Sequence, residues 1–204
     1  LPGGAFTPAG LSSFKSPQAG TDYLKLDKPA GVEAPPGKIE VVEFFWYACP
    51  HCNQFEPQLE EWVKRLPKDV AFRRAHVMFR NDFVPLQKLY YTLETLNLIE
   101  PLHRKVFYAI HVDKQRLNSD ETVLAWATKQ PGVDKAKFEE TYKSFGVATK
   151  VRKATQLQDA YKLAGVPAMG IAGRYYTDGT MAQSMERALQ VTDYLIAVQR
   201  KAKS

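Results

Sequence analysis

The two cysteines of the chain, Cys49 and Cys52, lie three residues apart, with Pro50 and His51 between them. Two thiols at this spacing on a helix face the same side and lie within reach of a disulfide bond. A bridge between residues so close in sequence cannot join distant segments of a fold. We therefore interpret the pair as redox-active or metal-binding rather than as a structural disulfide.

The segments on either side of the cysteines predict how the thiols are positioned. Residues 39–46 form an apolar run typical of a buried strand, and residues 50–65 have the spacing of a helix. Pro50 suits the first helical turn, so Cys49 is expected at the mouth of the helix, open to attack, with Cys52 one turn deeper. Free N–H groups and the helix dipole favour a thiolate at Cys49, and His51 adds to this effect.

Two motifs carry a resemblance to a known family. The run Cys49-Pro50-His51-Cys52 after Glu43-Phe44-Phe45 resembles the active site of the DsbA family of bacterial thiol:disulfide interchange proteins. Pro57 matches a proline at which helices of this kind often bend. Gly165-Val166-Pro167 resembles the cis-proline loop of the family. The similarity extends from roughly Lys28 to the C-terminus.

The resemblance implies an α/β protein with a thioredoxin fold and an inserted α-helical domain. It implies a dithiol oxidase that passes its Cys49–Cys52 disulfide to folding secreted proteins through a mixed disulfide on Cys49, which Cys52 or a substrate thiol resolves. Pro167 would follow a cis peptide bond, and the backbone of Val166 would pair with the substrate. The expected location is the periplasm, after removal of a signal peptide. The expected reoxidation partner is a DsbB-like, quinone-linked membrane protein, and no cofactor is expected besides the redox-active disulfide.

Glu43 is a carboxylate within the apolar strand. It would be solvated if the strand lay at the edge of a sheet. The DsbA family has a glutamate at this position, which favours a buried carboxylate under the active-site helix. Burial would raise the pKa of Glu43, and its charge would oppose a nearby thiolate. We expect Arg74 as its partner and a structural role for His76.

The order of elements predicts three regions. Residues 1–22 are expected to form a flexible or loosely docked arm. Residues 23–80 and 150–204 would form the thioredoxin-like domain, and residues 81–149 the inserted helical domain. The insertion has helical patterns near residues 85–98, 101–113, 119–129 and 135–145, and a further helix is expected over 148–164. We expect Asn118 and Glu121 to form a capping box, and Gly165 to terminate the last of these helices.

Composition excludes several classes of protein. The 204 residues are 45% hydrophobic and 25% charged, as is typical of a globular protein. The net charge of +6 is spread along the chain without a dense basic block, which disfavours nucleic-acid binding. No apolar run approaches the roughly 20 residues of a membrane span. We expect a monomer.

Three alternatives use the same residues. A reductase or isomerase of the same fold is disfavoured by the Pro-His dipeptide between the cysteines. A zinc site at Cys49, His51 and Cys52 would crowd three ligands into four residues, and the chain has no further cysteine to complete it. A non-catalytic, chaperone-like peptide-binding protein also fits the pattern. No metal site is expected.

Overall fold

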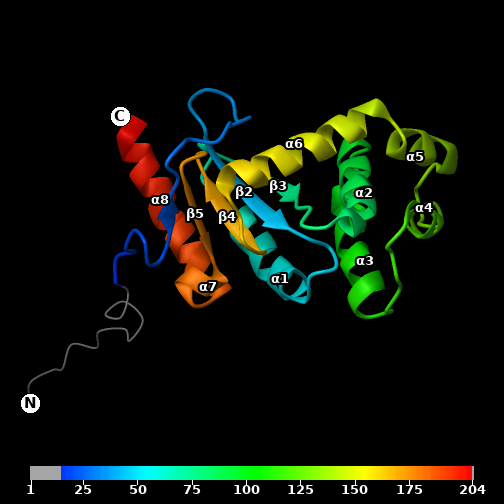
Figure 1. Cartoon of the computed structure of the whole chain (residues 1–204), viewed down its shortest axis with the longest axis horizontal. Coiled ribbons are helices and arrows are strands. Elements are labelled where there is room, and N and C mark those ends of the chain that lie inside the picture. The colour runs from blue at the N-terminus through cyan, green and yellow to red at the C-terminus, as the bar shows by residue number, and fades with distance from the viewer. Residues whose placement is uncertain (1–14, 204) are drawn as a thin grey trace, which may run out of the picture.

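The structure, a computed structural model, describes residues 15–203 and contains a five-stranded mixed sheet in the order β1-β5-β4-β2-β3 (Figure 1). β2 is parallel to β3 and antiparallel to β4, and the β4–β5 and β5–β1 pairs are antiparallel. The parallel pair requires a crossover, which the active-site helix α1 (Pro50–Lys64) provides. The strands are β1 (Leu24–Lys25), β2 (Ile39–Phe45), β3 (Val70–His76), β4 (Ala168–Ile171) and β5 (Tyr175–Asp178).

β2 is an interior strand, and each of its seven residues is buried. Alternation along the strand directs Val41, Glu43 and Phe45 to one face of the sheet and Val42 and Phe44 to the other. A strand covered on both faces is expected to be apolar throughout, so Glu43 is an exception with a polar side chain. Its face is the one that α1 covers.

Helices cover both faces of the sheet. α1 and α8 (Met185–Lys203) pack together with Ile39 and Val41 on one face. α6 (Phe145–Tyr161) packs on Val42 and Phe44 on the other. Figure 1 shows α6 running from the helical end of the molecule back across the sheet.

The expected helical insertion lies between β3 and β4 in the chain, and its helices gather at one end of the sheet (Figure 1). Its core is continuous with the active-site segment, because Phe45, Tyr47 and both cysteines belong to the same apolar cluster as α2, α3 and α4. The domain boundaries at residues 80 and 150 remain a prediction. Before α6 the insertion contains the 3₁₀ helix Asn81–Phe83 and helices α2 (Val84–Thr95), α3 (Ile99–His111), α4 (Asp120–Ala127) and α5 (Lys135–Tyr142).

Two expected helix termini were assigned to the wrong residues. The capping box of α4 is formed by Ser119 and Thr122, not by Asn118 and Glu121, because Ser119 has the extended backbone of an N-cap and accepts the Thr122 N–H. α6 ends at Tyr161, and Lys162 takes the left-handed conformation that we had expected of Gly165. Gly165 therefore lies in the loop before β4.

Two further segments differ from expectation. The short helix α7 (Gly179–Ala182), which Asp178 caps, was not predicted. The predicted arm divides into two parts. Residues 1–14 lie outside the described part of the chain, whereas residues 15–22 lie against α8, with Arg187 Nη2 donating to the Lys15 carbonyl at 2.9 Å.

Candidate active site

Cys49 is the N-cap residue of α1, and Pro50 occupies its first turn, as expected. A local turn places the thiol, because the Cys49 N–H donates to the Trp46 carbonyl at 3.0 Å. Cys52 lies in the first turns of the same helix, and the two thiols are not joined by a disulfide bond. The site therefore shows the dithiol form of the pair.

The two thiols have opposite pKa shifts. The pKa of Cys49 is lowered to about 6, first of all by a hydrogen bond from the Cys52 side chain. Burial opposes this shift, whereas the backbone N–H groups of Cys52 and His51 and the charge of His51 support it. The pKa of Cys52 is raised well above its ordinary value, mainly by burial and also by Cys49 and Glu43. Only Cys49 is therefore a thiolate near neutral pH.

Access to the thiols is narrower than expected. Cys49 is 7% exposed and Cys52 is 0% exposed. Cys49 remains the more accessible sulfur. It lies at the helix mouth, but the prediction that its thiol is open there is wrong. Its side chain packs in the apolar cluster of the helical insertion, and Val166 packs against the same cluster.

The loop before β4 lies at the thiol. The peptide bond between Val166 and Pro167 is cis, as expected. The Cys49 Sγ lies 3.8 Å from the Val166 carbonyl oxygen, with the thiol as donor. His51, Val166 and Pro167 line one cavity of about 480 Å³, together with residues of α7 and the start of α8. Neither α7 nor the side of this cavity that Gly179 and Met185 line was predicted from the sequence.

Glu43 is fully buried, and neither of its carboxylate oxygens accepts a hydrogen bond. Arg74 is near it, as expected, with Nε 3.5 Å from Glu43 Oε1. However, Arg74 Nη2 donates to Glu56 Oε1 at 2.7 Å, so Glu56 is the main partner of the guanidinium. The pKa of Glu43 is raised well above its usual range, first by burial and next by the charge of Glu56.

Glu56 was not predicted as a site residue. Burial raises its pKa, but His103 and Arg74 outweigh burial and lower it. Glu56 is thus the ionised carboxylate of the cluster, and Glu43 is the neutral one. One sequence signal could have identified it, because Glu56 follows Cys52 by four residues and shares its helix face. Its neighbour His103, whose Nε2 lies 3.3 Å from Glu56 Oε1, comes from the insertion, and sequence offered no signal for that contact.

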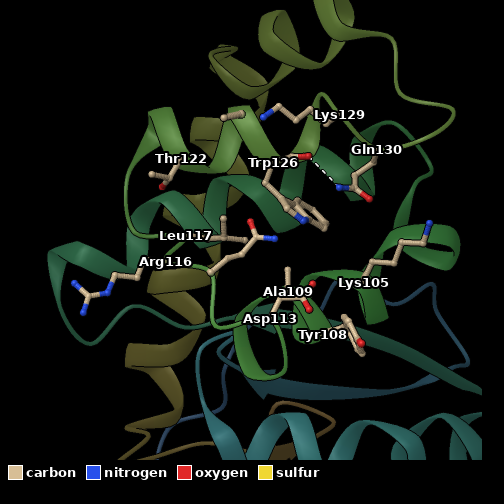
Figure 2. A pocket seen from close by; sticks show the side chains of 12 residues that line it. Lys105, Tyr108, Ala109, Asp113, Arg116, Leu117, Thr122, Trp126, Lys129 and Gln130 are labelled. Carbon is tan, nitrogen blue, oxygen red and sulfur yellow. Dashed lines mark hydrogen bonds between the residues drawn. The ribbon is translucent and has the colours of Figure 1, made fainter.

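A second cavity, of about 780 Å³, lies between α3 and α4, and neither cysteine lines it (Figure 2). Lys105, Tyr108 and Ala109 of α3 line it from one side, and Figure 2 shows the Trp126 indole extending into the space from α4. Within residues 15–203, no group of three or more His, Cys, Asp and Glu side chains could hold a metal ion. None of the helices described is long and apolar enough to span a membrane.

Comparisons with known proteins agree with this geometry. A family model described as a DSBA-like thioredoxin domain matches residues 80–190. The chain is 43% identical to the thiol:disulfide interchange protein DsbA of Bordetella parapertussis over 185 residues, which are 90% of this chain and 87% of the relative. It is 40% identical to the Burkholderia cepacia protein of the same name over 190 residues, which are 92% of this chain and 89% of the relative. The crystal structure of Pseudomonas aeruginosa DsbA is similar at a TM-score of 0.86 and 40% identity, over 91% of this chain and 96% of that chain. The architecture is a thioredoxin fold with a helical insertion.

Proposed function

The chain belongs to the DSBA-like thioredoxin family and is a thiol:disulfide oxidoreductase, and we propose that it donates its Cys49–Cys52 disulfide to folding extracytoplasmic proteins. The observation that carries this proposal is the asymmetry of the two sulfurs. The pKa of Cys49 is lowered to about 6 and that of Cys52 is raised. A site that stabilises one thiolate stabilises the reduced form, and its disulfide is then a strong oxidant.

The reaction begins on the oxidised pair. A substrate thiolate attacks Cys49 Sγ, forms a mixed disulfide with it and breaks the Cys49–Cys52 bond. Cys52 leaves as a thiolate and takes up a proton, in keeping with its raised pKa. A second substrate thiolate then attacks the substrate sulfur of the mixed disulfide and releases Cys49 as a thiolate. Two electrons pass from the substrate dithiol to the protein, and the substrate gains one disulfide bond.

The properties of the two sulfurs suit their roles in this reaction. Cys49 is the more exposed, so it is the sulfur that a substrate reaches. It is also the better leaving group, because a thiol of lower pKa leaves faster. The two sulfurs carry both electrons, so the proposal requires no cofactor.

The cavity beside His51, Val166 and Pro167 is the proposed substrate site. An extended peptide there can pair with the backbone of Val166, which lies against Cys49. Recognition through backbone groups tolerates many sequences, which suits an enzyme that acts on unfolded chains. Pro167 has no N–H, so it adds no competing donor near the sulfur.

We further propose a periplasmic location and reoxidation by a DsbB-like, quinone-linked membrane protein. Relatives named DsbA in Bordetella and Burkholderia support this assignment. Such a partner would accept both electrons from Cys49 and Cys52 and regenerate the disulfide.

The test is stoichiometric oxidation of a reduced dithiol peptide by the oxidised protein. We expect one peptide disulfide for each Cys49–Cys52 disulfide consumed. Reduced Cys52→Ala should attack a peptide supplied as a mixed disulfide with glutathione, release glutathione and hold the peptide on Cys49. The matched Cys49→Ala variant should hold none. A protein that reduces peptide disulfides but does not oxidise the dithiol would overturn the proposed direction.

A further inference from the structure

Tyr47, two residues before Cys49, forms hydrogen bonds with three of the four histidines of the chain. Its backbone N–H donates to His76 Nε2 at 3.2 Å, and its hydroxyl lies 2.6 Å from His103 Nδ1. His111 Nε2 donates to its carbonyl oxygen at 2.8 Å. The backbone donor, the backbone acceptor and the side chain of Tyr47 are thus each paired with a different imidazole. Tyr47 itself is fully buried.

The protonation of the buried rings is consistent with these contacts. His76 Nδ1 donates to the Val77 carbonyl at 2.9 Å, which leaves Nε2 free to accept from Tyr47. Burial lowers the pKa of His76 to about 3, so the ring remains the neutral acceptor that this contact needs. Since His103 Nε2 faces Glu56, its Nδ1 accepts from the Tyr47 hydroxyl. Each contact therefore has a defined donor and acceptor.

The three histidines come from two parts of the molecule. His76 ends β3 of the thioredoxin-like part, whereas His103 and His111 belong to α3 of the helical insertion. α3 thus has one side toward Tyr47, and Lys105, Tyr108 and Ala109 of the same helix line the cavity of Figure 2. Tyr47 is where the insertion is hydrogen-bonded to the backbone that leads into the active site.

The position of this backbone matters for the chemistry of Cys49. The thiolate is stabilised first by a hydrogen bond from the Cys52 side chain and further by the N–H groups of Cys52 and His51, and such bonds weaken steeply as distance and angle change. Cys49 is fixed on its N-terminal side by its own N–H bond to Trp46, the neighbour of Tyr47. A displacement of Tyr47 would therefore move the sulfur relative to its donors.

We propose that the helical insertion positions Cys49 through Tyr47, and that His111 is a positioning residue for this thiol. The proposal rests on the proposed function, since it concerns the same redox site. His111 is the suitable residue to change, because it is the last residue of α3 and only half-buried, whereas His76 and His103 are buried in the core. The His111 ring donates to a backbone carbonyl, and another N–H donor can take the place of the ring there.

The experiment is a pH titration of the reduced protein, in which ultraviolet absorbance monitors the Cys49 thiolate. We expect His111→Ala to raise the pKa of Cys49 by about one unit, and its disulfide to become a weaker oxidant of glutathione by about tenfold. His111→Gln, which can still donate an amide N–H, should restore both values most of the way. Tyr108→Ala, on an exposed part of the same helix, is the matched control and should change neither.

Two further variants make the result decisive. If His111→Ala does not fold, His111→Asn replaces it, because its amide is too short to reach the Tyr47 carbonyl. Tyr47→Phe removes the hydroxyl bond to His103 but keeps both backbone bonds, so it should shift the Cys49 pKa less than His111→Ala. Lower stability of the His111 variants with an unchanged Cys49 pKa would overturn the proposal. The titration follows the thiol itself, so its result stands whether or not the protein oxidises a substrate.

Discussion

The sulfur of Cys49 and the carbonyl oxygen of Val166 lie 3.8 Å apart, although 117 residues separate them in the chain. One belongs to the N-cap of α1 and the other to the loop before β4. Their contact joins the reactive sulfur to a backbone group that a substrate peptide can bind. Under the proposed function, disulfide exchange and peptide recognition would thus take place at one point of the molecule.

Alkylation of the reduced protein should distinguish the two thiols. The pKa of Cys49 is lowered to about 6, and that of Cys52 is raised, so iodoacetamide at pH 6 should modify Cys49 alone. The labelling rate should rise with pH through a midpoint near 6. Peptide mass spectrometry identifies the modified residue, and Cys49→Ser should lose the labelling. Modification that begins at Cys52 would reverse the assignment.

Glu43→Gln should make the stability of the protein fall less as pH rises above 4.5. The folded-state pKa of Glu43 is raised above 4.5, so its contribution to stability is fully present below pH 4.5 and is lost as pH rises toward the folded value. The free energy of unfolding of the variant, relative to that of the parent protein, should therefore increase from pH 4.5 to pH 8, by about 1–3 kcal/mol.

Urea unfolding of both reduced proteins at several pH values measures this difference. Glu140→Gln, an exposed change of the same type, is the control and should show no trend with pH. A gain that is equal at pH 4.5 and pH 8 would mean that Glu43 is not the neutral carboxyl of the cluster.

His51→Ser should retain disulfide exchange but weaken the oxidant. The positive charge of His51 and its backbone N–H both lower the pKa of Cys49, and the serine variant keeps only the N–H. We expect the pKa of Cys49 to rise by about one unit, which corresponds to about 1.4 kcal/mol. Thiolate absorbance and the equilibrium with glutathione measure the two effects. An unchanged Cys49 pKa would exclude His51 as an electrostatic contributor.

Pro167→Thr should slow the release of substrates from Cys49. The threonine adds an N–H donor and a hydroxyl next to Val166, where the proline offers neither. These groups can hold a bound peptide and hinder attack on the mixed disulfide. Non-reducing gels of acid-trapped reactions should show more mixed disulfide than with the parent protein, and circular dichroism should show a retained fold. Equal amounts with both proteins would count against a substrate role for this loop.

The features that sequence predicts best in this chain are local. The position of Cys49 follows from an apolar strand, Pro50 and a helical repeat within 20 residues or so of each other. The burial of Glu43 follows from alternation in β2, together with the family resemblance. These depend on backbone geometry that neighbouring residues set.

The features that sequence misses depend on packing between distant segments or on rare backbone conformations. His103 and His111 reach Tyr47 only because α3 packs against the active-site segment, and their own neighbours in sequence carry no sign of it. Lys162 adopts a φ of 53°, which is uncommon for lysine, so the sequence favours the glycine at 165 as the helix terminus. At α4, Asn118 and Ser119 are adjacent residues of similar capping preference, and propensity alone does not separate them.

The equilibrium between the Cys49–Cys52 disulfide and the glutathione couple measures whether the site, by stabilising the Cys49 thiolate, makes the disulfide a donor. Protein equilibrated in buffers of known glutathione redox potential, then acid-quenched and alkylated, gives the fraction oxidised. We predict a reduction potential higher than that of protein disulfide isomerase, which is about −180 mV. A potential near the about −270 mV of thioredoxin would contradict the account and indicate a reductase.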